Sequence, residues 1–177
     1  EAHQLADSMG IEHHVADERE AFRQIIVQNF IDEYCQGRTP NPCVMCNPLF
    51  KFRILAEWAD MLGCAYIATG HYARIEQLPN GRYAIRNSVT AAKDQTYALY
   101  NLTQEQLKRT LMPVGDYSND QIRAMAEKIG LPTAHKKDSQ EICFVDDRDD
   151  HNLYQKVGYK AIAKAVAYAI MNKPMQE

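Results

Sequence analysis

The sequence predicts an α/β domain, because short apolar segments typical of strands alternate with amphipathic helical segments along its 177 residues. A composition of 46% hydrophobic and 24% charged residues is typical of a soluble globular domain with a core of its own. The formal net charge of -3 gives no global positive field, so any contact with RNA would need a local basic patch. Neither a membrane-spanning apolar run nor a basic-then-apolar leader is apparent, so we expect no membrane partner and a cytoplasmic location.

The first third of the chain predicts three helices and one strand. Residues 1–9 predict a helix closed by Gly10, and residues 11–16 predict a strand. Asp17 and Glu20 have the spacing of a capping box for a second helix, which Gly37 ends. Its apolar residues recur at helical spacing: Phe22, Ile25, Ile26, Phe30 and Tyr34. A third helix is expected to begin near Asn47 and Pro48, so that residues 37–47, GRTPNPCVMCN, form a loop stiffened by proline.

The middle of the chain predicts strands and a hairpin. Residues 65–69 have the pattern of a buried parallel strand, and ligands bind at the carboxyl ends of such strands in open α/β sheets. Residues 72–76 and 82–86 alternate around Asn80-Gly81, which predicts an antiparallel hairpin. Residues 103–111 are expected to be helical, and Ser118 with Gln121 is expected to cap another helix.

Five cysteines without an export signal favour reduced thiols over a disulfide scaffold: Cys35, Cys43, Cys46, Cys64 and Cys143. Cys46 stands just ahead of the third predicted helix, whose dipole would lower the pKa of its thiol and make it a nucleophile. The same CxxC pair also fits half of a zinc site, although no second pair of matching spacing exists. Cys35 and Cys64 fall on apolar helix faces, where we expect buried thiols without a role.

Four segments in this order resemble the bacterial and organellar tRNA-specific 2-thiouridylases: GRTPNPCVMCN (37–47), ATGHYAR (68–74), KDQTY (93–97) and KKDSQEICF (136–144). The resemblance extends from residue 1 to about residue 145. It implies a doubly wound parallel sheet of the ATP-pyrophosphatase type, which carries a phosphate-binding loop after its first strand. Residues 1–147 would be part of this catalytic domain, and residues 148–177 an Ala-rich helical tail that the resemblance does not cover.

The chemistry implied by the resemblance is ATP-dependent transfer of sulfur to C2 of the wobble uridine of tRNA. ATP, with Mg²⁺, would adenylate the C2 oxygen, and AMP would leave when sulfur attacks. Cys143 would carry a persulfide delivered by a sulfur-relay or cysteine desulfurase protein. Cys46 would be the partner nucleophile, and the cycle would end in a disulfide between the two. Prolines would hold Cys46 in line with a flipped-out base.

The resemblance also implies which residues bind the substrates. Asn41, Pro42 and Cys43 correspond to a triplet that contacts the target base. Gly70 corresponds to a glycine that contacts ATP, with His71 beside it on the tRNA side. A second tRNA-contacting triplet corresponds to Lys93, Asp94 and Gln95. The hairpin arginines are expected to form an ordinary solvated face.

Three departures from the family pattern define the alternatives. Many members have Asp in place of Cys43. A second hypothesis is therefore that Cys43, Cys46 and Cys143 hold an iron–sulfur cluster with one open iron, which would deliver the sulfur in place of a persulfide. A binding-module alternative uses the same three cysteines in a metal- or cluster-binding α/β domain without catalysis of its own. The chain starts after the phosphate-binding loop, so we expect the 177-residue polypeptide alone not to adenylate uridine. The C-terminal domains of the family are not recognisable, and a third hypothesis is a truncated protein that folds poorly.

Overall fold

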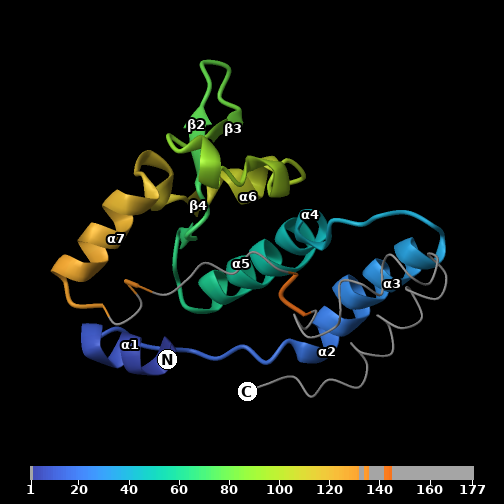
Figure 1. The fold of residues 1–177 in the computed structure, drawn as a ribbon, viewed down its shortest axis with the longest axis horizontal. Helices are drawn as coiled ribbons and strands as arrows, with labels where there is room; N and C mark the ends of the chain where they lie inside the picture. Colours follow the sequence, from blue (N-terminus) through green and yellow to red (C-terminus); the bar gives the residue numbers. More distant parts are fainter. Residues whose placement is uncertain (1, 132–133, 136–141, 145–177) are drawn as a thin grey trace.

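The computed structural model describes residues 2–131, 134–135 and 142–144 (Figure 1). Helix α1 (Ala2–Met9) forms as predicted. Residues 11–16 do not form the predicted strand, because no strand of the described residues pairs with this exposed segment to supply hydrogen bonds. The predicted capping box at Asp17 is also wrong. Its carboxylate pairs with the Arg19 guanidinium at 2.7 Å, and the next helix begins at Arg19 without a side-chain cap.

Two long helices are each interrupted by one π-helical turn. The first consists of α2 (Arg19–Phe22), the π turn η1 (Arg23–Val27) and α3 (Gln28–Cys35). The second consists of α4 (Pro42–Cys46), the π turn η2 (Asn47–Lys51) and α5 (Phe52–Met61). The two π turns contact each other, and α4 packs against η1. The first resemblance motif (37–47) therefore lies where these two helices contact each other.

The strands form two separate pairs. β1 (Ile67–Ala68) pairs in parallel with β4 (Thr110–Leu111), Ile67 opposite Thr110. The predicted hairpin is confirmed: β2 (Ala73–Gln77) and β3 (Tyr83–Asn87) are antiparallel, with Ile75 opposite Ile85. Figure 1 shows this hairpin projecting away from the long helices. The parallel pair and the helices give the predicted α/β class.

The remaining elements follow the hairpin. Short 3-10 turns at η3 (Ala91–Lys93) and η4 (Thr96–Ala98) lead to α6 (Gln104–Lys108), and η5 (Pro113–Asp116) precedes α7 (Asn119–Lys128). The helix predicted for 103–111 is shorter than expected, because Thr110 leaves it to enter β4. The predicted capping box at Ser118 is confirmed. The predicted tail, 148–177, lies outside the described residues.

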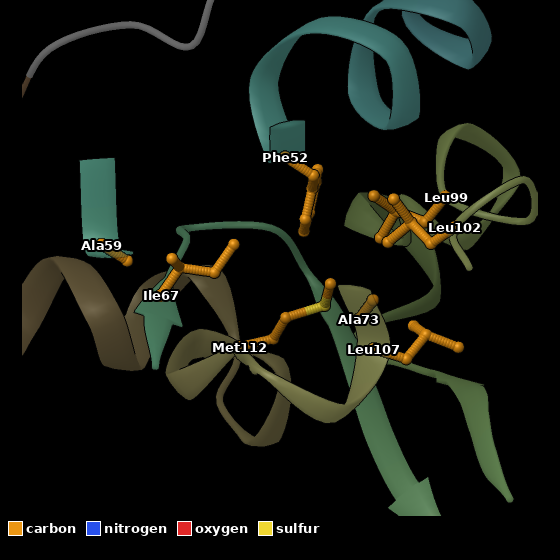
Figure 2. Packing of buried hydrophobic residues seen from close by; sticks show 8 residues of the cluster. All are labelled: Phe52, Ala59, Ile67, Ala73, Leu99, Leu102, Leu107 and Met112. Carbon is orange, nitrogen blue, oxygen red and sulfur yellow. The ribbon is translucent and has the colours of Figure 1, made fainter. Parts of the chain in front are cut away.

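The core lies where α5, both strand pairs and the η4–α6 segment meet. Figure 2 shows its side chains pointing toward one another: Phe52, Ala59, Ile67, Ala73, Leu99, Leu102, Leu107 and Met112. Phe52 and Leu99 are fully buried, and burying such side chains stabilises a fold by about 1.5–3 kcal/mol each. Within the described residues, no helix is both long and apolar enough to cross a lipid bilayer. The core thus joins the thiol-bearing helix to the strands.

Candidate functional site: a thiol cluster beside the end of a parallel strand

The predicted base-contacting triplet forms the start of α4. The Asn41 side chain accepts a hydrogen bond from the Cys43 backbone N–H at 3.1 Å, and Pro42 occupies the first helical turn. Both residues favour the start of a helix. The Asn41 side chain accepts a hydrogen bond from a backbone N–H that has no partner within the helix, and Pro42 has no N–H that would need one. The helix therefore begins at Pro42. The sequence prediction of a loop up to residue 47 and a helix start near Pro48 is wrong.

Cys46 lies inside this continuous helix and is 7% exposed. Burial raises the pKa of its thiol to about 11, a nearby Lys51 ammonium acts against that rise, and the neighbouring Cys143 and Cys43 thiols add to it. The prediction that a helix N-terminus lowers the pKa of Cys46 is therefore wrong. The Cys46 thiol is protonated at neutral pH, because its apolar surroundings disfavour the thiolate.

Cys143 reaches the same place from the far end of the described chain. Its neighbour Phe144 packs edge-to-face on two rings of the first long helix, with centroids 5.6 Å from Phe22 and 5.2 Å from Phe30. Cys143 is exposed as a residue, yet partial burial of its sulfur raises the pKa, with Lys51 lowering it and Cys43 raising it. Cys43, Cys46, Cys143 and Lys51 therefore lie within electrostatic range of one another, and we call these three thiols the thiol cluster.

The other two cysteines lie outside this cluster. Cys35 is the last residue of α3, and Cys64 follows the end of α5; both are exposed. The prediction that they are buried is wrong, because each stands at a helix end, where the apolar face no longer meets the core. All five cysteines are free thiols.

The segment after β1 supplies Gly70 and His71. The His71 ring stacks on the core ring of Phe52 with centroids 5.8 Å apart, and its Nδ1 lies 2.9 Å from the Thr69 hydroxyl. Burial first, and the Lys51 charge second, lower the pKa of His71 to about 4. The imidazole is therefore neutral at pH 7. Gly70 is exposed, and the space that a Cβ would occupy is open.

The predicted tRNA-contacting triplet lies in the turn after the hairpin. Gln95 is joined to Tyr72 by two hydrogen bonds: its backbone N–H donates to the Tyr72 carbonyl at 2.9 Å, and its side-chain oxygen accepts from the Tyr72 N–H at 3.0 Å. These bonds hold the turn beside the strand end that carries His71. Lys93 closes η3 at the start of the same turn.

Asp94 organises this turn from within. Its carboxylate accepts hydrogen bonds from the Ser88 N–H at 2.7 Å, from the Thr96 N–H at 3.1 Å and from the Thr96 hydroxyl. Partial burial alone would raise the pKa of Asp94, but these hydrogen bonds lower it below its ordinary value. Both carboxylate oxygens are engaged, so the described role of Asp94 is to shape the turn.

Two residues that sequence reasoning did not select connect these parts. Asn47 is 2% exposed, and its side-chain amide donates to the Ala98 carbonyl at 2.9 Å, which ties the thiol helix to η4. Its side-chain oxygen is buried without a partner among the described residues. Lys51 lies close enough to Cys46, Cys143 and His71 to affect the pKa of each. A polar residue and a cation next to a CxxC motif were the available signals.

Metal binding receives no support from the described geometry. In the parts of the chain that the structure describes, no three histidine, cysteine or carboxylate side chains are grouped so that they could hold a metal ion. Cys43, Cys46 and Cys143 thus influence one another electrostatically without being arranged as the ligands of one metal ion, and the iron–sulfur hypothesis is not favoured.

The fold and the site define an α/β domain with thiols near the end of a parallel strand. Residues 1–147 match the family model described as the tRNA methyl transferase HUP domain, and the chain belongs to this family. The match confirms the α/β fold class.

Relatives make the resemblance specific. The tRNA-specific 2-thiouridylase MnmA of Clostridioides difficile is 50% identical over 163 residues, which is 92% of this chain and 45% of that protein. MnmA of Lachnoclostridium phytofermentans is 53% identical over 149 residues, 84% of this chain and 42% of that protein. MnmA 3 of Bacteroides fragilis is 53% identical over 152 residues, with the same two shares of 84% and 42%. The chain spans less than half the length of these relatives, and the predicted family resemblance is confirmed.

Proposed function

We propose that the complete protein containing this chain transfers sulfur to C2 of the wobble uridine in tRNA, at the expense of ATP. The observation that carries the proposal is that Cys46 and Cys143, which are far apart in sequence, lie close enough for Cys143 to affect the pKa of Cys46 and for Lys51 to affect the pKa of both. Relatives whose names state tRNA 2-thiolation support the choice of substrate. The iron–sulfur alternative has no comparable observation in its favour.

The reaction needs activation before sulfur can attack. The uracil C2 carbonyl is a poor electrophile with a poor leaving oxygen, so ATP, with Mg²⁺, first adenylates that oxygen and releases pyrophosphate. Gly70 is the proposed ATP contact, because its open and exposed backbone allows close approach at the carboxyl end of β1. Adenylate formation turns the C2 oxygen into part of AMP, a good leaving group.

The two thiols then share the transfer. A persulfide on Cys143 attacks C2 with its terminal sulfur, the C2–O bond breaks, and AMP leaves. The thiolate of Cys46 next attacks the Cys143 Sγ, so that a Cys46–Cys143 disulfide forms and the thio group remains on C2. The transferred sulfur is reduced, the two cysteines are oxidised, and a reducing thiol regenerates them. A general base must take the proton of Cys46, because burial keeps the thiol protonated.

The substrate surfaces follow from the same geometry. The flipped-out base is proposed to contact Asn41, Pro42 and Cys43. These residues form the start of α4, which ends at Cys46. His71, Lys93, Asp94 and Gln95 are proposed to form the tRNA-facing edge. Of these, Asp94 would act through the shape of its turn, because both of its oxygens already accept hydrogen bonds.

Two proposals concern partners and location. A sulfur-relay protein or a cysteine desulfurase would load Cys143, whose exposed position makes it accessible to a donor protein. The cytoplasm is the proposed location, because the mechanism requires reduced thiols and all five cysteines are free.

The test is thiol replacement in the complete protein, with 2-thiouridine in tRNA measured by mass spectrometry of nucleosides. Cys143→Ser and Cys46→Ser are expected to abolish thiolation, because each removes a sulfur that forms or breaks a bond. Cys64→Ser is the matched control, since Cys64 is an exposed thiol outside the cluster, and it should retain activity. Normal thiolation by the Cys143→Ser protein would overturn the proposal.

A further inference from the structure

The π turn η2 determines which side chain shares a face with Cys46. In a regular α-helix, residues three and four apart are neighbours, whereas residues five apart point in different directions. In η2 the Phe52 backbone N–H donates to the Asn47 carbonyl, a bond that spans five residues. Because a π turn has more residues per turn than an α-helix, we infer that Lys51, five residues after Cys46, lies nearer to the face of the thiol than it would in a regular α-helix.

The groups around Lys51 come from three separate segments. Cys46 precedes Lys51 on the same helix. Cys143 is held in place by its neighbour Phe144, which packs on Phe30 of the first long helix. His71 stacks on Phe52, the residue that follows Lys51. The Lys51 charge acts on all three groups. Lys51 itself is exposed, and among the described ion pairs none involves it. Within the part of the chain that the structure describes, the groups on which the Lys51 charge acts are therefore the thiols and His71, and none of the described ion pairs joins it to a carboxylate.

We propose that Lys51 is the charge-stabilising residue of the thiol site, which the π turn places so that its ammonium stabilises an anionic sulfur on Cys46 or Cys143. This inference rests on the proposed sulfur-transfer function. Buried thiols release protons reluctantly, so a site that needs a thiolate requires a compensating cation. Displacement of water by a bound substrate would strengthen this attraction, because the effective dielectric constant falls. His71 remains neutral and does not compete for the anion.

The experiment follows alkylation of Cys46 in the complete protein without tRNA or ATP. Iodoacetamide is the probe because it is uncharged, and peptide mass spectrometry reports Cys46, Cys143 and Cys64 separately. Lys51→Met is expected to lower the rates at Cys46 and Cys143 by roughly two- to five-fold, the size of one partly screened charge interaction. Lys51→Arg should retain the rates, and Cys64 should not change in either variant. Lys108→Met, which removes an exposed lysine from α6, is the matched control.

Salt separates charge from packing. Added sodium chloride should slow alkylation of Cys46 in the wild type and have little effect in Lys51→Met, because only the wild type has a cation to screen. Unchanged rates in Lys51→Met would overturn the proposal, and so would equal losses in Lys51→Met and Lys51→Arg, which would indicate a packing role. A lysine that only contacts tRNA phosphate would leave alkylation without tRNA unchanged. The sulfur-transfer proposal is tested by tRNA thiolation in the cysteine variants, and the role of Lys51 by alkylation rates without tRNA. A failure of one proposal can therefore be told apart from a failure of the other.

Discussion

His71 illustrates how one side chain is fixed by its surroundings. It stacks on Phe52 in the core, contacts the Thr69 hydroxyl, and lies within the field of Lys51. Each of these contacts suits a neutral ring, and burial penalises the imidazolium. A neutral imidazole beside a substrate can donate or accept a hydrogen bond without adding charge.

Stability should therefore fall as His71 is forced to take a proton. Its pKa is about 4 in the folded protein and about 6.5 in an unfolded chain, so the unfolded state binds the proton first as the pH falls. The contribution of His71 is complete above pH 6.5 and is lost progressively toward pH 4. We expect the melting temperature of the wild type to fall more steeply between pH 7 and pH 5 than that of His71→Phe, which keeps the stacking and cannot titrate. Parallel melting curves of the two proteins would contradict this.

At the scale of elements, local signals predicted some structures well. The hairpin followed from Asn80-Gly81 between alternating segments, and the helix after Ser118 followed from its capping box. These features depend on interactions within a few residues, so the sequence contains the whole signal. The grouping of segments in the site also agrees with the resemblance motifs.

Other elements depended on tertiary context and were predicted wrongly. Pro48 was interpreted as the start of a helix, yet it lies inside one, at the π turn. Proline has no N–H to donate to the carbonyl of the preceding turn, which disturbs a regular helix. The Pro48 carbonyl accepts a hydrogen bond from the Gln106 side-chain amide at 2.9 Å. The partner comes from α6, far away in sequence. The position of Lys51 follows from this turn, so it could not be found from helical periodicity.

A close approach of two elements gives the next prediction. Gly115 in η5 packs against β2 so tightly that a Cβ would lie 1.9 Å from the Ala73 carbonyl oxygen, which is backbone and cannot rotate away. Gly115→Ala should destabilise the protein by about 1–3 kcal/mol, the usual cost of overpacking, in equilibrium urea unfolding. Gly70→Ala is the matched control, because the space there is open, and its stability should stay within about 0.5 kcal/mol of the wild type. A Gly115→Ala protein as stable as the control would show that η5 and β2 can separate freely.

At the scale of the whole molecule, the site is assembled by two independent attachments. The helix that carries Cys46 is tied to the core through Phe52 and to η4 through Asn47. Cys143 is attached to the other long helix through the rings that contact Phe144. The packing of α4 on η1 then sets the relation between the two sulfurs. Contacts distant in sequence, such as these, explain why the resemblance motifs meet although no local pattern predicts it.

This arrangement predicts that Phe144 controls the meeting of the two sulfurs more than it controls stability. Phe144→Ala removes both ring contacts that hold Cys143, while the core around Phe52 and Leu99 is untouched. We expect slower formation of a Cys46–Cys143 disulfide under a mild thiol oxidant such as diamide, together with lower thiolation of tRNA, at a nearly unchanged melting temperature. Peptide mapping of the oxidised protein measures the disulfide. Phe50→Ala is the matched control, because Phe50 also packs on Phe22, at 5.2 Å, but it does not carry Cys143. If both variants formed the disulfide at the wild-type rate, anchoring by Phe144 would not be what brings the sulfurs together.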